Sequence, residues 1–394
     1  MNFDVQYTDE QQAFRVEARA WLEEHVPEDL RFPLEHGEPL ETYLQRRQLG
    51  RELGERGWLY PTAPREYGGG GLDIDSALVL IEEMARFELS LPPYYDSGGA
   101  IGNVAIRVWG TDEQRRALLP PIYRGEQRTW QLLTEPGAGS DVASASTQAT
   151  RDGDDYIING AKVFIGSEHG ADALWTLVRT GAADARHQNL SWFMIDASTP
   201  GVTIEPMHLI GDADKCAVYF DDARVPADRL VGGENKGWDV ASTHLDLEHG
   251  LRSDTLIGAR LERVWNSLLR VCAWRDQRTM DLLAEGYVRK ETVRILGMRN
   301  FWLVKANAPR TYEGPQAYLI EKKTGQWFAQ LLLDILGPQA LIDSGTRDDA
   351  LVSGHQAGSL LAMHGGGTAE IQKLVMARRI GIGTRNAEKA GRTE

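Results

Sequence analysis

The spacing of apolar residues along the chain changes twice, from a helical to a strand-like period and back. Residues 1–125 have the helical period, and Thr8 with Gln11 makes a capping box at the start of the first segment. Residues 111–114 repeat this box ahead of a later segment, which we expect to stop at Pro120-Pro121. The pattern predicts an N-terminal helical domain, with further helices over 41–57 and 75–84.

Residues 126–233 have the strand-like period of two. Short runs rich in β-branched and aromatic residues are separated by turn-forming pairs such as Asn159-Gly160. These features predict a middle antiparallel β domain, in which Trp175 and Trp192 occupy strand positions and belong to the core. The predicted strands include residues 155–158, 174–178, 190–195 and 217–220.

Residues 234–394 return to the helical period. An apolar pattern from Leu245 to Leu268 predicts one long helix. Because strands and helices do not alternate, a Rossmann domain is disfavoured, and we expect an α+β multidomain chain that ends in a C-terminal helical bundle. Further helices are predicted over 280–306, 313–335 and 348–363.

The composition favours a soluble, cytoplasmic enzyme. The chain has 394 residues and a formal net charge of −14, which weighs against nucleic acid and anionic membranes as partners. No apolar run approaches the roughly 20 residues of a membrane span. Cys216 and Cys272 make no disulfide framework, and the nine histidines have no metal-ligand spacing, so no metal is expected. Acidic residues near the N-terminus argue against a transit peptide.

Residues 133–141 form the densest candidate for a ligand site. Their sequence is Leu-Thr-Glu-Pro-Gly-Ala-Gly-Ser-Asp, and such small and hydroxyl residues let a backbone approach a planar or phosphorylated ligand. The alternative is an ordinary glycine-rich loop at a domain boundary, because a single glycine loop carries little specificity.

A second glycine cluster precedes a helix near the C-terminus. Gly365-Gly366-Gly367 would expose free amides at the positive end of that helix, which is a natural anion site. The alternative is a flexible hinge ahead of an amphipathic helix.

Glu248 is the third candidate, because Leu245 and Leu251 place apolar side chains on its helix face. A carboxylate in an apolar pocket can act as a general base near neutral pH. The alternative is a solvated surface pair between Glu248 and Arg252.

Five motifs in the same order and spacing resemble the acyl-CoA dehydrogenase family, and the resemblance covers nearly the whole chain. It implies three domains, at 1–125, 126–233 and 234–394, with FAD held between them and across a subunit interface. The motifs are residues 64–69, 134–141, 159–162, 220–226 and 367–372.

The resemblance also implies which positions meet the cofactor and the substrate. Acyl-CoA contacts are expected from Ser140, Leu245, Asp246 and His249. FAD contacts are expected from Leu133, Thr134, Gly139, Ser140, Phe164, Ile165, Gly166, Ser167, Gly337, Thr368 and Glu370.

The position of the catalytic base departs from the commonest family pattern. Many members place a glutamate directly before the Gly-Thr pair, where this chain has Gly366. A minority use a glutamate on the earlier helix within a Leu-x-Leu-Glu-Arg pattern, which residues 245–249 resemble. Glu248 therefore becomes the favoured base, while His249 replaces the arginine that contacts CoA.

The residues beside the flavin depart as well. The family's tryptophan and hydroxyl residue correspond to Phe164 and Gly166. The hydrogen bond near flavin N5 is therefore expected either to be missing or to move to Ser167.

The reaction implied by the resemblance is α,β-dehydrogenation of an acyl-CoA thioester to the trans-2-enoyl-CoA. Glu248 would remove the α-proton, hydride would pass to flavin N5, and the Gly366 amide would hold the enolate oxygen. Electrons would continue to an electron-transfer flavoprotein, and the subunits would form a homotetramer, a homodimer or a heteromer. The alternatives are an oxidase or monooxygenase on the same scaffold, and a non-catalytic subunit that completes a partner's site.

Overall fold

The computed structural model describes residues 5–31, 38–209, 214–248, 258–272, 276–309 and 311–382. These residues form two compact units, one of residues 7–245 and one that contains the described residues from 246 onward together with 5–6. Each unit is treated by itself below. His249 lies outside the described residues.

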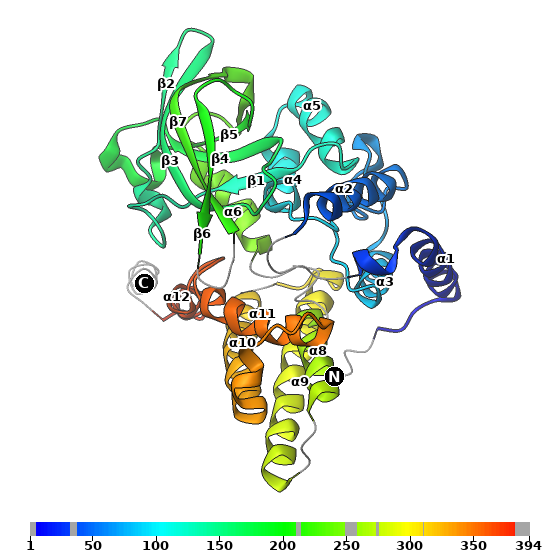
Figure 1. Ribbon diagram of the computed structural model, residues 1–394. Helices are drawn as coiled ribbons and strands as arrows, with labels where there is room; N and C mark the ends of the chain where they lie inside the picture. The colour runs from blue at the N-terminus through cyan, green and yellow to red at the C-terminus, as the bar shows by residue number, and fades with distance from the viewer. Residues whose placement is uncertain are drawn as a thin grey trace, which may run out of the picture. The chain divides into compact units, whose positions relative to one another are not determined.

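The first unit begins with helices, as the apolar spacing predicted (Figure 1). Both predicted capping boxes are present, at Thr8 with Gln11 and at Thr111 with Gln114. The helices are α1 (Asp9–His25), α2 (Leu40–Glu55), α3 (Ile74–Arg86), α4 (Ser97–Trp109) and α5 (Asp112–Tyr123).

The expected stop at Pro120-Pro121 is wrong, because α5 continues through both prolines to Tyr123. A proline lacks only the amide donor, and its carbonyl still accepts hydrogen bonds. The Pro120 carbonyl accepts from the Arg124 amide at 3.0 Å and the Pro121 carbonyl from the Glu126 amide at 2.9 Å. The prolines therefore sit in a last turn that is completed through their carbonyls.

The sequence pattern did not reveal α4, because its glycines are typical of a loop. A Cβ on Gly98 would lie 2.5 Å from the Thr129 side chain, and one on Gly102 would lie 3.1 Å from the Trp175 ring. The helix therefore approaches the sheet too closely for larger residues, and packing overrides the low helix propensity of glycine.

The middle part of this unit is an eight-stranded sheet in the order β6-β7-β3-β2-β4-β5-β8, with β1 added beside β4. Most neighbours are antiparallel, as predicted, but β1 and β2 each pair with β4 in parallel, so the sheet is mixed. The described strands are β1 (Thr129–Leu132), β2 (Gln148–Asp152), β3 (Asp155–Ile165), β4 (Ala173–Arg179), β5 (Leu190–Asp196), β6 (Val202–His208), β7 (Asp214–Pro226) and β8 (Leu230–Val231).

Strands β4 and β5 are buried on both faces. Trp175 and Trp192 are fully buried, stack with ring centroids 4.8 Å apart and join the cluster that includes the helices. Leu174 and Phe193 point to the opposite face and join a second cluster within the sheet. The predicted core role of the two tryptophans is confirmed.

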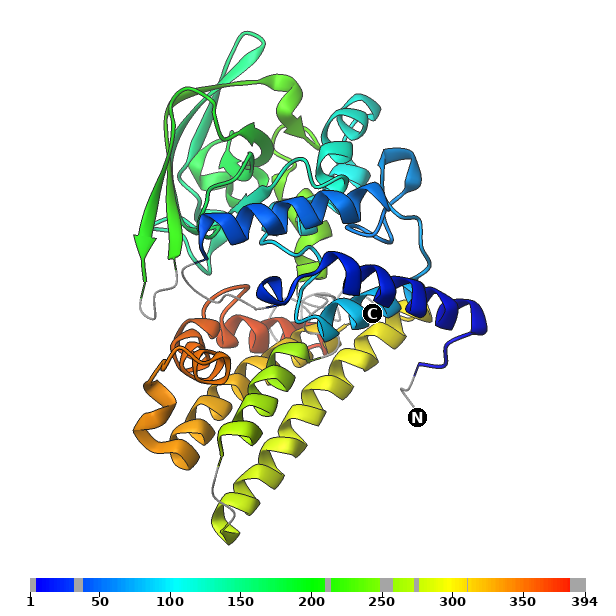
Figure 2. The same cartoon turned by 45° about the vertical axis from the view of Figure 1, so that its right-hand side comes forward.

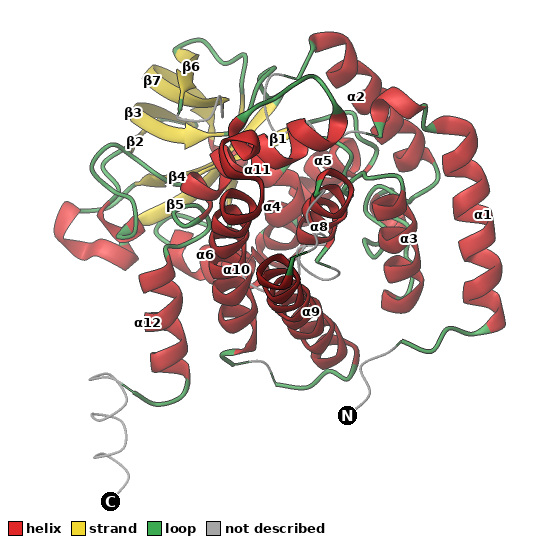
Figure 3. Ribbon diagram, turned by 60° about the horizontal axis from the view of Figure 1, so that its bottom comes forward, coloured by secondary structure: helices red, strands yellow, loops and turns green. Residues whose placement is uncertain are grey.

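The second unit is helical, and Figures 2 and 3 show α8, α9 and α10 running side by side in it. The predicted helix from Leu245 to Leu268 is interrupted, since α6 (Gly237–Glu248) ends before Gly258, which has a φ of +64° and precedes α8. The other helices are α8 (Ala259–Val271), α9 (Gln277–Lys305), α10 (Glu313–Leu336), α11 (Arg347–Ala362) and α12 (Ala369–Arg379). None of the helices in the described ranges is both long and apolar enough to cross a bilayer.

Candidate active site

The glycine loop after β1 is an open, exposed turn. Backbone hydrogen bonds close it between Glu135 and Ala138, at 3.0 and 3.1 Å. Gly139 and Ser140 follow on the surface, and a Cβ on Gly139 would find no atom of the described structure within 4 Å. Space beside this predicted ligand loop is therefore available to a bound molecule.

A buried ion pair holds the base of this loop. The Lys162 ammonium lies 2.8 Å from the Glu135 carboxylate, and both side chains are almost fully buried. Lys162 also donates to the Leu133 carbonyl at 3.1 Å, and the Ser146 amide and hydroxyl donate to Glu135. The Lys162 bonds fix the loop on strand β3, and the Ser146 bonds tie Glu135 to the segment that follows the loop.

The pair also shifts the pKa values of both partners. Burial alone would raise the pKa of Glu135, but the Lys162 ammonium and the Ser146 hydrogen bonds outweigh it and lower that pKa to about 2. Burial lowers the pKa of Lys162, while the Glu135 carboxylate acts in the opposite direction. Glu135 is therefore a carboxylate at neutral pH and accepts hydrogen bonds from the amides of Ser146 and Thr147, which follow the loop.

The predicted flavin-facing segment, residues 164–167, follows directly from β3. The Val163 amide donates to the Thr134 carbonyl at 2.9 Å, so the glycine loop and this segment lie side by side. Phe164 has a φ of +60° and leaves 55% of its surface exposed. An aromatic side chain held outward in the left-handed region is an unusual arrangement that a neighbouring ligand would explain.

Gly166 is required by its surroundings. Its φ is +63°, and a Cβ there would lie 2.3–2.6 Å from three atoms of the Trp130 ring. The hydroxyl residue that the family carries here would collide with Trp130. The replacement by glycine is therefore a consequence of the bulky residue that lies beneath the segment.

Two cations support the same segment from within the unit. The Lys215 ammonium donates to the Gly166 carbonyl at 2.6 Å, and the Arg128 guanidinium donates to the Ser167 hydroxyl oxygen at 2.6 Å. Arg128 was not singled out from the sequence, since it lies in no motif. Glu135 and Lys162 belong to two of the quoted motifs, so their shared presence could have signalled the ion pair.

These residues fit FAD as a ligand. The buried Trp130 Nε1 atom, in the ring beneath Gly166, has no hydrogen-bond partner among the described residues. Within the same part of the chain, no hydrogen bond involves the Thr134 hydroxyl on the glycine loop. Unused donors and acceptors beside an open glycine loop and an exposed aromatic ring suit a large, flat, polar cofactor.

In the second unit, the other predicted cofactor loop is held through its carbonyl oxygens. Tyr318 and Lys322 donate to the Gly365 carbonyl, and Gln372 Nε2 donates to the Gly366 carbonyl at 3.0 Å. Gly366 has a φ of +61°. Because the carbonyls of Gly365 and Gly366 accept hydrogen bonds inside the unit, the amides of the turn are the groups that can bind a ligand.

The remaining predicted contacts of this unit lie at helix ends. The Thr368 hydroxyl caps α12 by accepting from the Ile371 amide at 3.2 Å, and Glu370 is exposed in the first turn. Gly337 ends α10 with a φ of +61° and open space around its Cα. Thr368 and Glu370 are thus together with Gly366 at the start of α12.

The predicted base and substrate contacts lie at the end of α6. Leu245, Asp246 and Glu248 are helical in backbone conformation, which agrees with the predicted helix there. Thr243, one turn earlier, accepts a hydrogen bond from Trp109 Nε1 at 2.8 Å, which fixes this part of α6 to α4 within the first unit.

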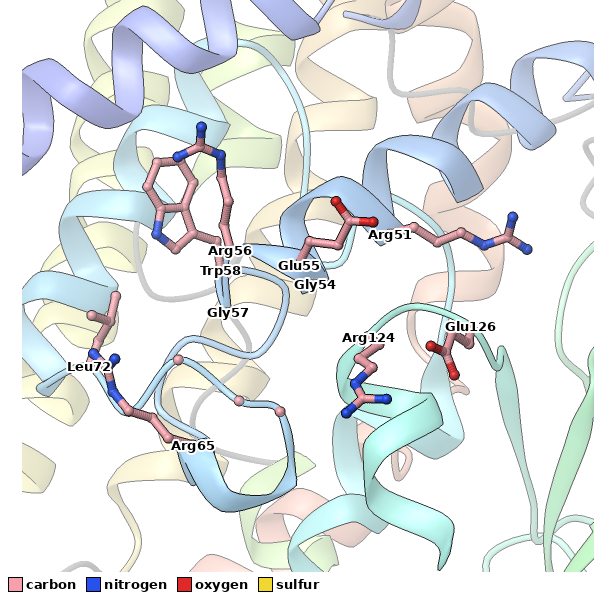
Figure 4. Close-up of a pocket in the computed structure, with 13 residues that line it drawn as sticks. Arg51, Gly54, Glu55, Arg56, Gly57, Trp58, Arg65, Leu72, Arg124 and Glu126 are labelled. Atoms are coloured by element: carbon pink, nitrogen blue, oxygen red, sulfur yellow. The ribbon is translucent and has the colours of Figure 1, made fainter.

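A hollow of about 550 Å³ in the first unit is a different feature, between the end of α2 and the residues after α5. Figure 4 shows that its arginine side chains point in different directions rather than toward one centre. Two glutamates also line it, so it does not focus positive charge on a ligand. The charged residues of its lining are Arg51, Arg56, Arg65, Arg124, Glu55 and Glu126.

Comparison with family models matches the three parts of the chain in order. The N-terminal domain of acyl-CoA dehydrogenases matches residues 8–126, the middle domain 131–223 and the C-terminal domain 235–381. The acyl-CoA dehydrogenase IpdE1 of Mycobacterium tuberculosis is 29% identical over 379 residues, which cover 93% of this chain and 96% of that protein. A mitochondrial isobutyryl-CoA dehydrogenase of Dictyostelium discoideum is 34% identical over about half of each chain.

Solved structures show the same relationship. The ChsE4–ChsE5 complex from Mycobacterium tuberculosis has a TM-score of 0.80 at 27% identity, covering 97% of this chain and 100% of the matched chain. A steroid ACAD, Tcur3481–Tcur3483, has a TM-score of 0.81 at 26% identity and covers 96% and 98%. Matched in all three domains and over nearly its whole length, the chain belongs to the acyl-CoA dehydrogenase family of FAD-dependent oxidoreductases that act on acyl-CoA.

Proposed function

We propose that the chain catalyses α,β-dehydrogenation of an acyl-CoA thioester to the trans-2-enoyl-CoA. The observation that carries the proposal is the braced pair of segments at residues 133–140 and 164–167. A buried ion pair joins the first segment to Lys162 of β3, two residues before the second, and the exposed side presents open glycines and the Phe164 ring. Such a preorganised surface positions a cofactor without reorganisation when the substrate reacts.

In this proposal Glu248 removes the α-proton of the acyl chain, and the Gly366 amide holds the thioester oxygen on which negative charge develops. The Gly366 role is supported by the turn around it, whose carbonyls are already bonded to Lys322 and Gln372. FAD, when bound, supplies the redox chemistry by accepting the hydride from the β-carbon.

The remaining site assignments are proposals from the family resemblance. Ser140, Leu245, Asp246 and His249 would contact the acyl-CoA. Leu133, Thr134, Gly139, Ser140, Phe164, Ile165, Gly166, Ser167, Gly337, Thr368 and Glu370 would contact FAD. The domain limits at 125 and 233 and a cytoplasmic location likewise stay predictions.

Single-turnover reduction of the flavin tests the base. With Glu248→Gln we expect the rate of flavin bleaching by acyl-CoA without oxygen to fall about 10²–10⁴-fold, the usual contribution of a general base. Asp239→Asn is the matched control, because Asp239 is an exposed acid on the same helix. An undiminished rate in Glu248→Gln with FAD bound would exclude Glu248 as the base.

The substrate and the electron acceptor need separate measurements. One structural relative is named as a steroid ACAD, which makes a steroid side-chain thioester a candidate beside simple fatty acyl chains. Bleaching of the bound flavin by a panel of thioesters distinguishes the candidate substrates.

We propose an electron-transfer flavoprotein as the electron acceptor. Rapid reoxidation of the reduced flavin by oxygen alone would instead indicate an oxidase.

The oligomeric state is proposed from the surface of α9. Its apolar side chains repeat at intervals of about seven residues and leave 41–61% of their surface exposed, which suggests a partner helix. We propose a second copy of this chain, as a homodimer or homotetramer, and light scattering tests this. A colourless protein that gains FAD only on mixing with a second subunit would favour a heteromer, as in the ChsE4–ChsE5 complex. The exposed apolar residues of α9 are Met280, Tyr287, Val288, Ile295 and Trp302.

A further inference from the structure

Arg128 is a buried cation directly beneath the predicted flavin-facing segment. Only 2% of its surface is exposed. Its guanidinium donates to the carbonyls of Glu168 and Gly170 at 2.8 and 2.7 Å, and to the Tyr95 carbonyl at 2.7 Å. A fourth bond goes to the Ser167 hydroxyl oxygen at 2.6 Å. One side chain therefore holds the whole turn that follows β3.

The charge of Arg128 is not engaged in a direct ion pair. None of the ion pairs within the described ranges includes its guanidinium, and the buried Asp96 carboxylate, whose pKa the Arg128 charge acts to lower, is the carboxylate that interacts with it from further away. The nearby Asp172 carboxylate binds the backbone amide of Arg128 and the guanidinium of Arg47 instead. The Arg128 guanidinium is packed against the rings of Tyr43 and Trp130, at 4.8 and 5.4 Å from their centroids. A buried charge whose hydrogen-bond partners are all neutral, and whose carboxylate neighbour makes no direct contact, keeps a field over several ångströms.

The bond to Ser167 also fixes where the Ser167 proton can go. A guanidinium has only donors, so the Ser167 oxygen must be the acceptor in their bond. The hydroxyl proton then has to point away from Arg128, and the donation from a cation makes that hydroxyl a stronger donor. Ser167 is half-buried at the surface of the segment expected to meet the flavin.

We propose that Arg128 is a positioning and electrostatic residue for bound FAD, which turns the Ser167 hydroxyl into a donor toward the cofactor and favours its reduced, more negatively charged form. This inference rests on the proposed function, because it requires FAD at residues 164–167. It gives the chain a substitute for the hydroxyl that Trp130 excludes from position 166. Arg128 acts through Ser167 and through its charge, without touching the reacting atoms of the substrate.

The test is the midpoint reduction potential of bound FAD, measured by equilibration with a reference dye. Arg128→Met should weaken binding of reduced relative to oxidised FAD about tenfold, which for a two-electron couple lowers the potential by about 30 mV. Arg128→Lys keeps the charge but loses the planar fork, so its potential should stay closer to that of the wild type. Arg47→Gln is the matched control, because Arg47 is also buried beside Tyr43 but pairs with Asp172 and makes no bond to residues 166–170.

Ser167→Ala keeps the test decisive if Arg128→Met does not fold. It removes only the hydroxyl and leaves the three carbonyl bonds of Arg128, so the fold should persist while the potential falls and the absorption spectrum of bound FAD shifts. An unchanged potential in Ser167→Ala, together with an unchanged potential in any folded Arg128→Met, would overturn the inference. A wild-type protein that binds no FAD would instead overturn the proposed function, so the two failures are distinguishable.

Discussion

The glycine loop after β1 and the turn after β3 lie side by side but are held by different kinds of buried charge. At the loop, Lys162 faces the carboxylate of Glu135 at 2.8 Å, so the charges compensate each other. At the turn, Arg128 donates to carbonyls and a hydroxyl, and the buried Asp96 carboxylate offsets its charge without a direct ion pair. The first arrangement fixes a backbone, whereas the second also projects a field toward whatever binds there.

The same difference predicts how each region responds to mutation. Breaking a compensated pair leaves one charge buried without its partner, so we expect mostly a lower free energy of unfolding. Removing Arg128 releases its own desolvation cost but leaves three carbonyls without their donor, so its effect should show in the properties of the ligand as well as in stability. The predictions below separate stability from cofactor binding in this part of the molecule.

The largest effect is expected from Lys162→Met. The change leaves the Glu135 carboxylate buried, and we expect the free energy of unfolding in urea to fall by about 3–5 kcal/mol. Lys215→Met is the control, since Lys215 is half-buried and donates to the Gly166 carbonyl. The double variant Lys162→Met with Glu135→Gln should lose less than the sum of the single variants, and simple additivity would show that the pair is not coupled.

Acid should weaken the loop through the same pair. Because the pKa of Glu135 is lowered from 4.5 to about 2 in the folded protein, the unfolded state binds the proton more readily. The stabilisation is complete above the unfolded pKa and is lost as the pH falls toward the folded one, up to about 3 kcal/mol in all. Urea unfolding between about pH 5 and pH 3 measures the slope, which Glu135→Gln should flatten. Equal slopes in the two proteins would contradict the assignment.

Gly166→Ala is expected to cost about 2–4 kcal/mol of stability, from the positive φ and from the collision with Trp130. Gly170→Ala is a close control, because its φ is +69° but no atom lies within 4 Å of the added Cβ in the described structure. It should show the backbone strain alone, at about 1 kcal/mol. If the two variants unfold at the same urea concentration, Trp130 does not exclude a side chain from position 166.

The smallest effect on stability is expected from Gly139→Ala, at about 0.5 kcal/mol or less, because the site is open and its φ is not positive. The same Cβ would stand in the space that we assign to FAD. Titration of the apoprotein should then show FAD affinity reduced about tenfold, or about 1.4 kcal/mol. Gly153→Ala, in a turn away from the site with open space, should leave FAD affinity unchanged.

The local features of the fold were readable from the chain. Apolar periods located most helices of both helical regions, α4 excepted, and the main strands, and the capping boxes at Thr8 and Thr111 marked two helix starts within the described residues. Motif order was enough to indicate the family and FAD. These features succeed because each depends on residues a few positions apart.

Contacts between distant parts of the chain decided the rest. Helix α4 forms in spite of its glycines because it packs closely on Thr129 and Trp175. Gly166 is needed because of its positive φ and because Trp130, 36 positions earlier, lies beneath it, and Arg128 reaches Ser167 only once β1 and the turn after β3 are neighbours. The sequence by itself determined the elements, the family and the cofactor class, since local spacing encodes them. Which side chains support the cofactor surface was decided by tertiary structure, because burial and charge compensation exist only after folding brings those residues together.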